Sequence, residues 1–250
     1  MKITRLLPLI AILSLHLPVL GQSDSKNMAT SPAPHPGKEA SHAKFNEVSK
    51  QGKAQLVFLG DSITAGWNGR GKKAWDQYWA PMQAVNFGIG GDRTEHILWR
   101  LQNGNYDGLK PKLTVLMIGT NNTGHEGRAM PEHGDAIYKS SAEQTAQGVT
   151  DIIKLLKKKQ PQMKILLLAI FPRGADNNNK MRQQNQAANK IIAKLDDDKT
   201  VFFLDINQAF LQADGTLSKD IMPDLLHPNA AGYEIWSKGI MDKVKQLMAD

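Results

Sequence analysis

Five short apolar runs recur at roughly even intervals along the chain. Runs of this length with little polar interruption are typical of strands that are buried on both faces, as in a parallel sheet. We therefore predict five strands, at residues 56–59, 84–87, 113–118, 165–170 and 201–204.

Helical patterns lie between these runs. Two of them begin with Asp or Ser followed three residues later by Glu, which is typical of a capping box. The predicted helices are 92–101, opened by Asp92 with Glu95; 140–160, opened by Ser140 with Glu143 and ended before Pro161; 181–195; and 232–248. Alternating strands and helices indicate βαβ units with right-handed crossovers. We predict an α/β protein with three layers, α/β/α, around a five-stranded parallel sheet.

The N-terminal 21 residues have the pattern of an export signal. Lys2 and Arg5 precede a mostly apolar stretch at 6–20, and small residues suit cleavage after Gly21. The stretch is short for a membrane span, which needs about 20 residues; an uncleaved anchor is the alternative. We predict a signal peptide at 1–21, a periplasmic or secreted protein, and no stable membrane insertion after cleavage.

The segment after the signal is rich in Ser, Pro, Ala, Asn and Lys, a composition typical of disorder. We predict a disordered spacer at residues 22–39 and one globular domain at 40–250. A chain of 250 residues accommodates one large α/β domain.

Composition excludes several kinds of site. The chain has no Cys, so it has no disulfide, thiolate nucleophile or Cys-ligated metal. Its formal net charge is +7, but basic runs such as 157–159 end a predicted helix, where cations complement the helix dipole. Aromatic residues do not alternate with basic ones as a base-stacking surface requires. We therefore expect no nucleic-acid partner.

Polar residues follow three of the predicted strands and recur in a late loop. Gly60-Asp61-Ser62 follows the first strand, Gly88 opens the segment after the second, and Gly119-Thr120-Asn121 follows the third. Asp224 and His227 lie in a loop beyond the fifth. Sites in open parallel sheets form at the carboxyl ends of the strands, so these residues are expected to meet at one edge.

Together these residues have the parts of an acyl-transfer site. Ser62 is the candidate nucleophile, His227 the base that activates it, and Asp224 the group that orients the imidazole. The backbone N–H groups of Ser62 and Gly88 and the side-chain amide of Asn121 are the candidate oxyanion hole. Each residue taken alone is also an ordinary turn or cap residue, so the hypothesis depends on the set.

Three other candidate motifs each lack a residue or a spacing that their chemistry requires. Residues 66–73, GWNGRGKK, approach a P-loop, but Lys73 stands where the magnesium-binding Ser or Thr belongs. GIGGDR at 88–93 lacks the last glycine of a dinucleotide fingerprint. The His and Glu residues within 125–133 lack the HExxH spacing and are interpreted as a polar loop near the site mouth. We expect no metal and no cofactor.

Four charged residues beside these motifs have less specific interpretations. Asp61 and Asp92 are expected to cap helices or to order the turns that follow the strands. Arg93 and Arg173 either contact substrate or form structural ion pairs, and the sequence leaves both alternatives open.

The four blocks GDSIT, NFGIGGD, GTNN and DLLHPN resemble the SGNH hydrolases, also called GDSL-type esterases. The residues that match the family name are Ser62, Gly88, Asn121 and His227. The longer stretch NFGIGGDRTEHILWRLQNG, with GTNN and FPRG, resembles the catalytic-subunit branch of platelet-activating-factor acetylhydrolase. Many family members have Asp where this chain has Asn122, and that branch shares the Asn.

The resemblance implies the flavodoxin-like SGNH hydrolase fold and hydrolysis of carboxylic esters. We expect an exported serine esterase that removes small acyl groups, acetyl foremost, from oxygen esters. Because the resembled subunits are cytosolic and this chain has an export pattern, acetylated carbohydrates are the first expected substrates. The alternatives are a short-chain lipid or phospholipid acetylhydrolase and a catalytically inactive binding module on the same fold.

Overall fold

The computed structural model describes residues 27–249. The predicted signal peptide at 1–21 lies outside these residues. Within them, no helix is both long enough and apolar enough to cross a bilayer.

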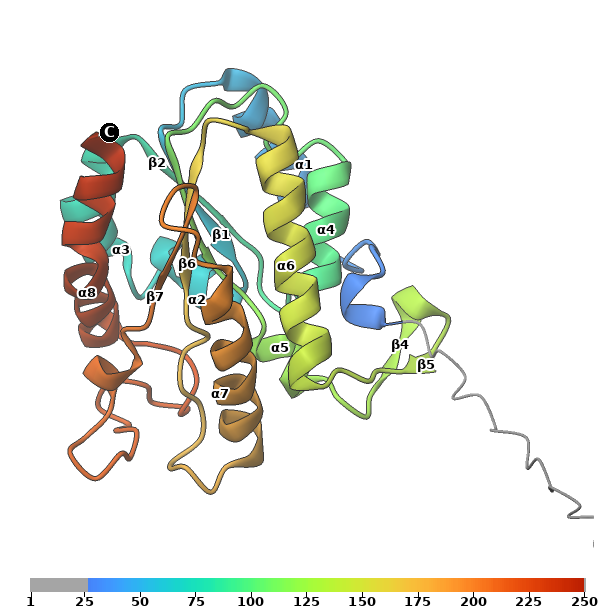
Figure 1. Cartoon of the computed structure of the whole chain (residues 1–250), viewed down its shortest axis with the longest axis vertical. Coiled ribbons are helices and arrows are strands. Elements are labelled where there is room, and N and C mark those ends of the chain that lie inside the picture. Colours follow the sequence, from blue (N-terminus) through green and yellow to red (C-terminus); the bar gives the residue numbers. More distant parts are fainter. Residues whose placement is uncertain (1–26, 250) are drawn as a thin grey trace, which may run out of the picture.

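The fold is built on a five-stranded parallel sheet with strand order β2-β1-β3-β6-β7 (Figure 1). The strands are β1 (Leu56–Gly60), β2 (Ala84–Gly88), β3 (Leu113–Met117), β6 (Lys164–Leu168) and β7 (Val201–Leu204). The predicted α/β fold with a five-stranded parallel sheet is confirmed, since every neighbouring pair is parallel.

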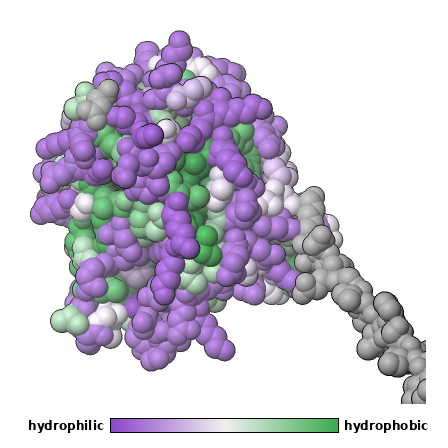
Figure 2. Space-filling model, viewed as in Figure 1, coloured by the Kyte–Doolittle hydropathy of each residue, from purple (hydrophilic) through white to green (hydrophobic). Residues whose placement is uncertain are grey.

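Both faces of the sheet are buried, which explains the continuous apolar runs. In β1, Val57 and Leu59 pack into one core while Leu56 and Phe58 pack into the other. One face is covered by α1 (Glu39–Gln51), α4 (Thr94–Gln102), α6 (Ala142–Lys159) and α7 (Lys180–Ile192), and the other by α3 (Lys72–Ala74) and α8 (Ala230–Ala249) (Figure 1). Hydrophilic side chains cover most of the outer face that Figure 2 shows.

Strand register sets the position of the site. Gly60, the last residue of β1, pairs with Gly88 of β2 on one side and with Met117 of β3 on the other. The carboxyl ends of these three strands are therefore level, and the loops that follow them begin at one edge of the sheet.

Two predicted helix starts are displaced. Ser141 and Gln144 form the capping box of α6, with Ser141 Oγ accepting the Gln144 N–H at 3.2 Å and Gln144 Oε1 accepting the Ser141 N–H at 2.9 Å. This pair lies one residue beyond the predicted one. Helix α4 begins at Thr94 with Arg93 as its N-cap, whose N–H donates to His96 Nδ1 at 3.1 Å. Asp92 does not cap this helix, and its carboxylate is bonded to Arg100.

The prediction of a disordered spacer at 22–39 is wrong for its described part, residues 27–38. This segment contains a short 3₁₀ helix, η1 (Met28–Thr30), and its Ala29 and Ala33 side chains are buried. Thr94 Oγ1 donates to Ala29 O at 2.7 Å. The composition suggested disorder because it has few large apolar residues, but small side chains let the segment pack closely on α4 and α6.

Several short elements were not predicted. Helices α2 (Ser62–Ala65) and α5 (Thr120–Gly124) follow β1 and β3, and the two-residue strands β4 (Ala129–Met130) and β5 (Ala136–Ile137) form a hairpin. The remaining short helices are η2 (Gly66–Asn68), η3 (Trp75–Trp79), η4 (Ala80–Met82), η5 (Pro131–His133), η6 (Ala193–Leu195) and η7 (Asn207–Phe210).

The close packing of segment 27–38 predicts the effect of one substitution. An alanine methyl at Gly148 of α6 would lie 2.6 Å from Ala29 O and 2.4 Å from Thr94 Oγ1. In an unconstrained helix the change from Gly to Ala stabilises by about 1 kcal/mol. Here we expect Gly148→Ala to lower the free energy of unfolding by about 1–3 kcal/mol in urea titrations, because the backbone must move apart.

Gln147→Ala, at the exposed neighbouring position of α6, is the control and should change stability by less than about 0.5 kcal/mol. A Gly148→Ala protein more stable than wild type would show that segment 27–38 does not pack against α6.

Candidate active site

Ser62 lies at the carboxyl end of β1 as the first residue of α2. The preceding residue, Asp61, caps this helix because its Oδ1 accepts the Ile63 N–H at 2.9 Å. Ser62 Oγ lies 2.9 Å from Nε2 of His227, although 165 positions separate the two residues. The fold thus brings the candidate nucleophile and the candidate base into hydrogen-bond contact.

Asp224 lies on the other side of the His227 ring. Its Oδ2 is 2.7 Å from His227 Nδ1, and its Oδ1 accepts the backbone N–H groups of His227 at 2.7 Å and Leu226 at 3.1 Å. Partial burial raises the pKa of Asp224, but the hydrogen bonds from His227 outweigh burial and leave that pKa below its ordinary value. An ionised Asp224 holds the proton on Nδ1 and leaves Nε2 facing Ser62.

The loop that carries Asp224 and His227 is held in an uncommon conformation. Leu225 has a φ of 57°, in the left-handed region that bulky residues rarely adopt. Two hydrogen bonds hold it, from the Leu225 N–H to Met222 O at 2.7 Å and from the Gly174 N–H to Leu225 O at 2.8 Å. Backbone strain of this kind is concentrated at functional sites.

Asn121 lies at the carboxyl end of β3, in α5. Its Nδ2 donates to Asp92 O at 2.9 Å, which fixes the amide and leaves its second N–H without a partner among the described residues. The chain turns toward α5 at Gly119, where φ is 132° and a Cβ would lie 2.6 Å from Ile170 Cδ1. Only glycine fits this turn.

The geometry contradicts the prediction that Gly88 belongs to the oxyanion hole. The Gly88 N–H already donates to Asn86 Oδ1 at 2.9 Å. A Cβ at Gly88 would lie 2.2 Å from Ala65 N. Gly88 is therefore required because β2 and α2 approach closely, and its N–H is not available to a substrate.

The turn that follows offers better-placed donors. The Asp92 N–H donates to Ile89 O at 3.2 Å, which closes a turn with Gly90 and Gly91 at its centre. A Cβ on Gly90 would lie 3.9 Å from Ser62 Cβ. The backbone N–H groups of Gly90, Gly91 and Ser62 donate to no group within residues 27–249. Free donors thus lie near the Ser62 hydroxyl.

A buried ion pair holds this turn. Asp92 Oδ2 accepts from Arg100 Nη1 at 2.7 Å, and Asp92 Oδ1 lies 2.8 Å from His35 Nδ1. Arg100 Nη2 donates to Phe87 O at 2.8 Å. Asp92 therefore orders the turn, as predicted, and Asp61 caps a helix, as predicted.

Arg93 forms structural ion pairs. Its guanidinium contacts Glu95, with Nε 2.5 Å from Oε1, and it also contacts Glu132 of the β4–β5 hairpin. All three side chains are buried, so Glu132, in the segment interpreted as a polar loop, belongs to a buried ion pair. No local pattern in the sequence indicates this pairing, because Glu132 and Arg93 are 39 positions apart.

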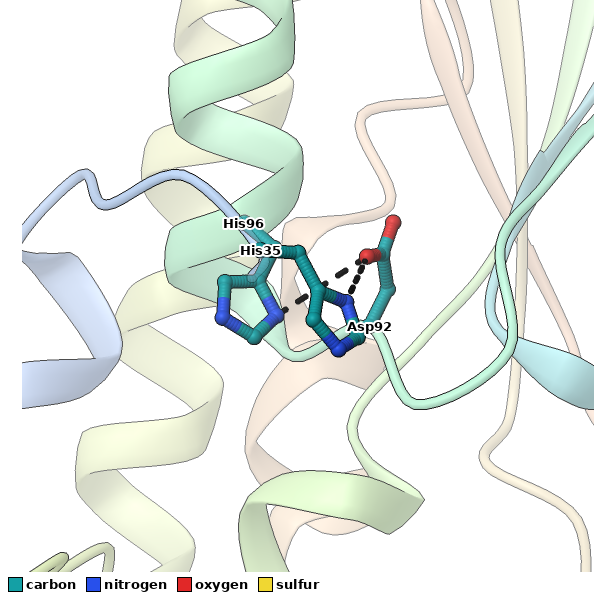
Figure 3. Close-up of side chains that lie close together, drawn as sticks. All are labelled: His35, Asp92 and His96. Carbon is teal, nitrogen blue, oxygen red and sulfur yellow. Dashed lines mark hydrogen bonds and ion pairs between the residues drawn. The ribbon is translucent and has the colours of Figure 1, made fainter. Parts of the chain in front are cut away.

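One cluster behind the turn has metal-ligating residue types. The rings of His35 and His96 stack with centroids 4.2 Å apart, and the Asp92 carboxylate lies beside them (Figure 3). However, His96 Nδ1 accepts the Arg93 N–H at 3.1 Å, and Arg100 occupies the second Asp92 oxygen. Burial and the positive charge of Arg93 hold the pKa of His96 well below its ordinary value. These contacts suit a structural cluster better than a cation site.

Known proteins resemble this chain over most of its length. A model of the GDSL-like lipase/acylhydrolase family matches residues 58–235. Platelet-activating factor acetylhydrolase IB subunit alpha1 of Homo sapiens is 34% identical over 209 residues, which cover 83% of each chain. Subunit alpha2 of Rattus norvegicus is 34% identical over 210 residues, or 84% of each chain.

Solved structures share the fold. A GDSL-like lipase from Bacteroides thetaiotaomicron superposes with a TM-score of 0.63 at 19% identity, covering 83% of this chain and 98% of that one. An acetylxylan esterase from Geobacillus stearothermophilus gives a TM-score of 0.60 at 19% identity, covering 78% and 96%. The chain belongs to the GDSL-like lipase/acylhydrolase family of ester-hydrolysing serine hydrolases.

Proposed function

We propose that this protein is an exported serine esterase that removes acetyl and other small acyl groups from oxygen esters. The observation that carries the proposal is the continuous hydrogen-bonded chain from Ser62 Oγ through His227 to Asp224, with contacts of 2.9 and 2.7 Å. The alternative to an enzyme, a catalytically inactive binding module, does not require this chain of hydrogen bonds.

In the proposed mechanism, Ser62 Oγ attacks the ester carbonyl carbon while His227 Nε2 takes the hydroxyl proton. The carbonyl oxygen becomes an oxyanion, which accepts hydrogen bonds from the Ser62 N–H, the Gly90–Gly91 turn and the free N–H of Asn121. Donors of this kind, fixed before the reaction, are each worth about 10²–10³ in rate.

The tetrahedral intermediate then expels the alcohol, which receives the proton from His227. Water, activated by the same imidazole, attacks the acyl-enzyme and releases the carboxylic acid. Throughout both halves, ionised Asp224 keeps His227 oriented and stabilises its positively charged form. No step requires a metal or an organic cofactor.

Acetylated carbohydrates are the first proposed substrates. The export pattern at residues 1–21 supports this, because an exported esterase meets polysaccharides and their fragments, and the fold is shared with an acetylxylan esterase. A short-chain lipid or phospholipid ester is the second candidate, favoured by relatives named as platelet-activating factor acetylhydrolase subunits. Export to the periplasm or the medium is part of the proposal.

Asp61 contributes a buried carboxyl group directly before the nucleophile. Burial raises the pKa of Asp61 to about 7, although the Ile63 N–H and Arg173 oppose the increase. A protonated Asp61 adds no negative charge next to the developing oxyanion, and it still caps α2.

The nucleophile assignment predicts that Ser62→Ala abolishes hydrolysis of p-nitrophenyl acetate, with kcat/KM falling by about 10³ or more. Ser41→Ala, on α1 and without a side-chain hydrogen bond to any described residue, is the matched control and should leave kcat/KM unchanged. Circular dichroism should show both variants folded. Appreciable turnover by folded Ser62→Ala would refute the mechanism.

The role of Asp224 predicts that Asp224→Asn lowers kcat by several orders of magnitude, about 10⁴ in the serine-protease case, because an amide can favour the wrong imidazole tautomer. Asp220→Asn makes the same charge change at an exposed position of the same loop and should be nearly neutral. If folded Asp224→Asn keeps more than about a tenth of the wild-type kcat, the site is a Ser62–His227 dyad.

The raised pKa of Asp61 predicts that the stability difference between wild type and Asp61→Asn depends on pH. Between the ordinary value of 3.8 and about 7, the native chain holds a proton that the unfolded chain has released, so the contribution of Asp61 to stability falls as pH rises through this window. Asp61→Asn keeps a capping side chain and cannot titrate. Its free energy of unfolding relative to wild type should therefore increase from about pH 4.5 to about pH 7.5.

Urea titrations of both proteins at each pH measure this difference. A difference that is independent of pH would mean that Asp61 is ionised in the native state throughout.

A further inference from the structure

Two arginines on loops that follow the carboxyl ends of strands form no ion pair with a carboxylate of the described residues. Arg173 lies in the loop after β6, while Arg128 follows α5. By contrast, Arg93 and Arg100 at the same end of the sheet are each paired with a buried acid.

Arg173 is fixed between the loops that carry Asn121 and His227. Its Nη1 donates to Thr120 O at 2.8 Å and to Thr120 Oγ1 at 3.1 Å, directly before Asn121. The Gly174 N–H donates to Leu225 O at 2.8 Å, which ties the loop of Arg173 to that of His227. Nε and Nη2 of Arg173 donate to no described residue, so the guanidinium keeps donors for a ligand.

Burial lowers the pKa of Arg173, and the charge of Asp61 opposes this effect, but Asp61 does not neutralise the guanidinium fully. Asp61 is buried, and its pKa of about 7 leaves it protonated for much of the time at neutral pH. Arg128, in contrast, adds positive charge, since its proximity lowers the pKa of both Arg173 and His125 after the larger effect of burial.

Arg128 is exposed, and its side chain forms no ion pair or hydrogen bond within residues 27–249. Glu126, two positions before it, pairs with neither arginine. His125 Nδ1 donates to the backbone O of Asn121 at 2.8 Å, and burial lowers the pKa of His125, so the neutral ring has no N–H left for an anion. Arg173 and Arg128 thus present guanidinium donors on the two loops next to Asn121.

We propose that Arg173 and Arg128 form a subsite for an anionic group, a carboxylate or a phosphate, on the alcohol part of the ester. This inference rests on the proposed function, in which the acyl group is small and uncharged and the anion must therefore belong to the alcohol. The planar guanidinium matches both carboxylate and phosphate oxygens. The substrate class becomes an acetyl ester of an acidic alcohol, such as an acetylated uronic acid residue or an acetylated glycerol phosphate.

Two esters of equal size test the subsite: 4-acetoxybenzoate, which is anionic, and 4-acetoxybenzamide, which is neutral. We expect wild type to have the higher kcat/KM for the anionic ester. Arg128→Gln and Arg173→Gln should each lower the ratio of the two kcat/KM values by about tenfold, the size expected for one charge-assisted hydrogen bond. Rising salt concentration should lower the wild-type ratio as well.

The control is Lys158→Gln, which removes one positive charge from the exposed surface of α6 near its C-terminal end and should leave the ratio unchanged. Two further pairs distinguish the sources of the anion: acetylated methyl glucuronoside against acetylated methyl glucoside, and acetylglycerol phosphate against acetylglycerol. If the arginine-dependent preference for the anionic ester is larger in the glucuronoside pair, the group bound is a carboxylate. If it is larger in the glycerol phosphate pair, the group bound is a phosphate.

The inference is overturned if wild type hydrolyses both benzoate-derived esters without preference, or if the arginine variants slow both by the same factor. If the protein shows no Ser62-dependent hydrolysis of even the neutral ester, the proposed function itself is wrong. That result differs from a failure of the subsite alone.

Discussion

The buried ion pair between Asp92 and Arg100 is the interaction on which the site depends. The Asp92 carboxylate fixes the Gly90–Gly91 turn to α4, while its backbone carbonyl accepts the side-chain amide of Asn121. One residue therefore positions donors that arrive from two strands. Breaking a buried pair by removing one partner costs about 3–5 kcal/mol, so the pair stabilises this arrangement of donors before a substrate binds.

The other half of the site relies on local backbone geometry. The Asp224 carboxylate bonds both the backbone and the ring of His227, so the acid proposed to orient the base also shapes the loop that carries it. The two halves meet at Ser62, where β1 ends level with its neighbours. The proposed catalytic groups thus lie on short loops held by the sheet, as is usual in α/β proteins.

The sequence predicted those features that depend on local pattern. Apolar runs located the five strands, because burial on both faces demands continuous hydrophobicity. The order of polar residues after the strands placed Ser62, Asn121, Asp224 and His227 at one edge. Two contacts were not predictable. The Asn86 side chain accepts the Gly88 N–H although the two residues are only two positions apart, and Glu132 pairs with Arg93 across 39 positions from the unforeseen β4–β5 hairpin. Segment 27–38 was also misjudged, since the close approach of Ala29 to Gly148 can be seen only in three dimensions.

In the proposed mechanism, Ser62 is the residue that His227 and Asp224 activate. Labelling of the protein with a fluorophosphonate, followed by mass spectrometry of its peptides, tests this role directly. We expect one phosphonyl group per chain, on the peptide that contains Ser62, with loss of esterase activity in proportion to labelling. Labelling of a different residue in step with inactivation, or full resistance to the reagent by an active enzyme, would contradict it.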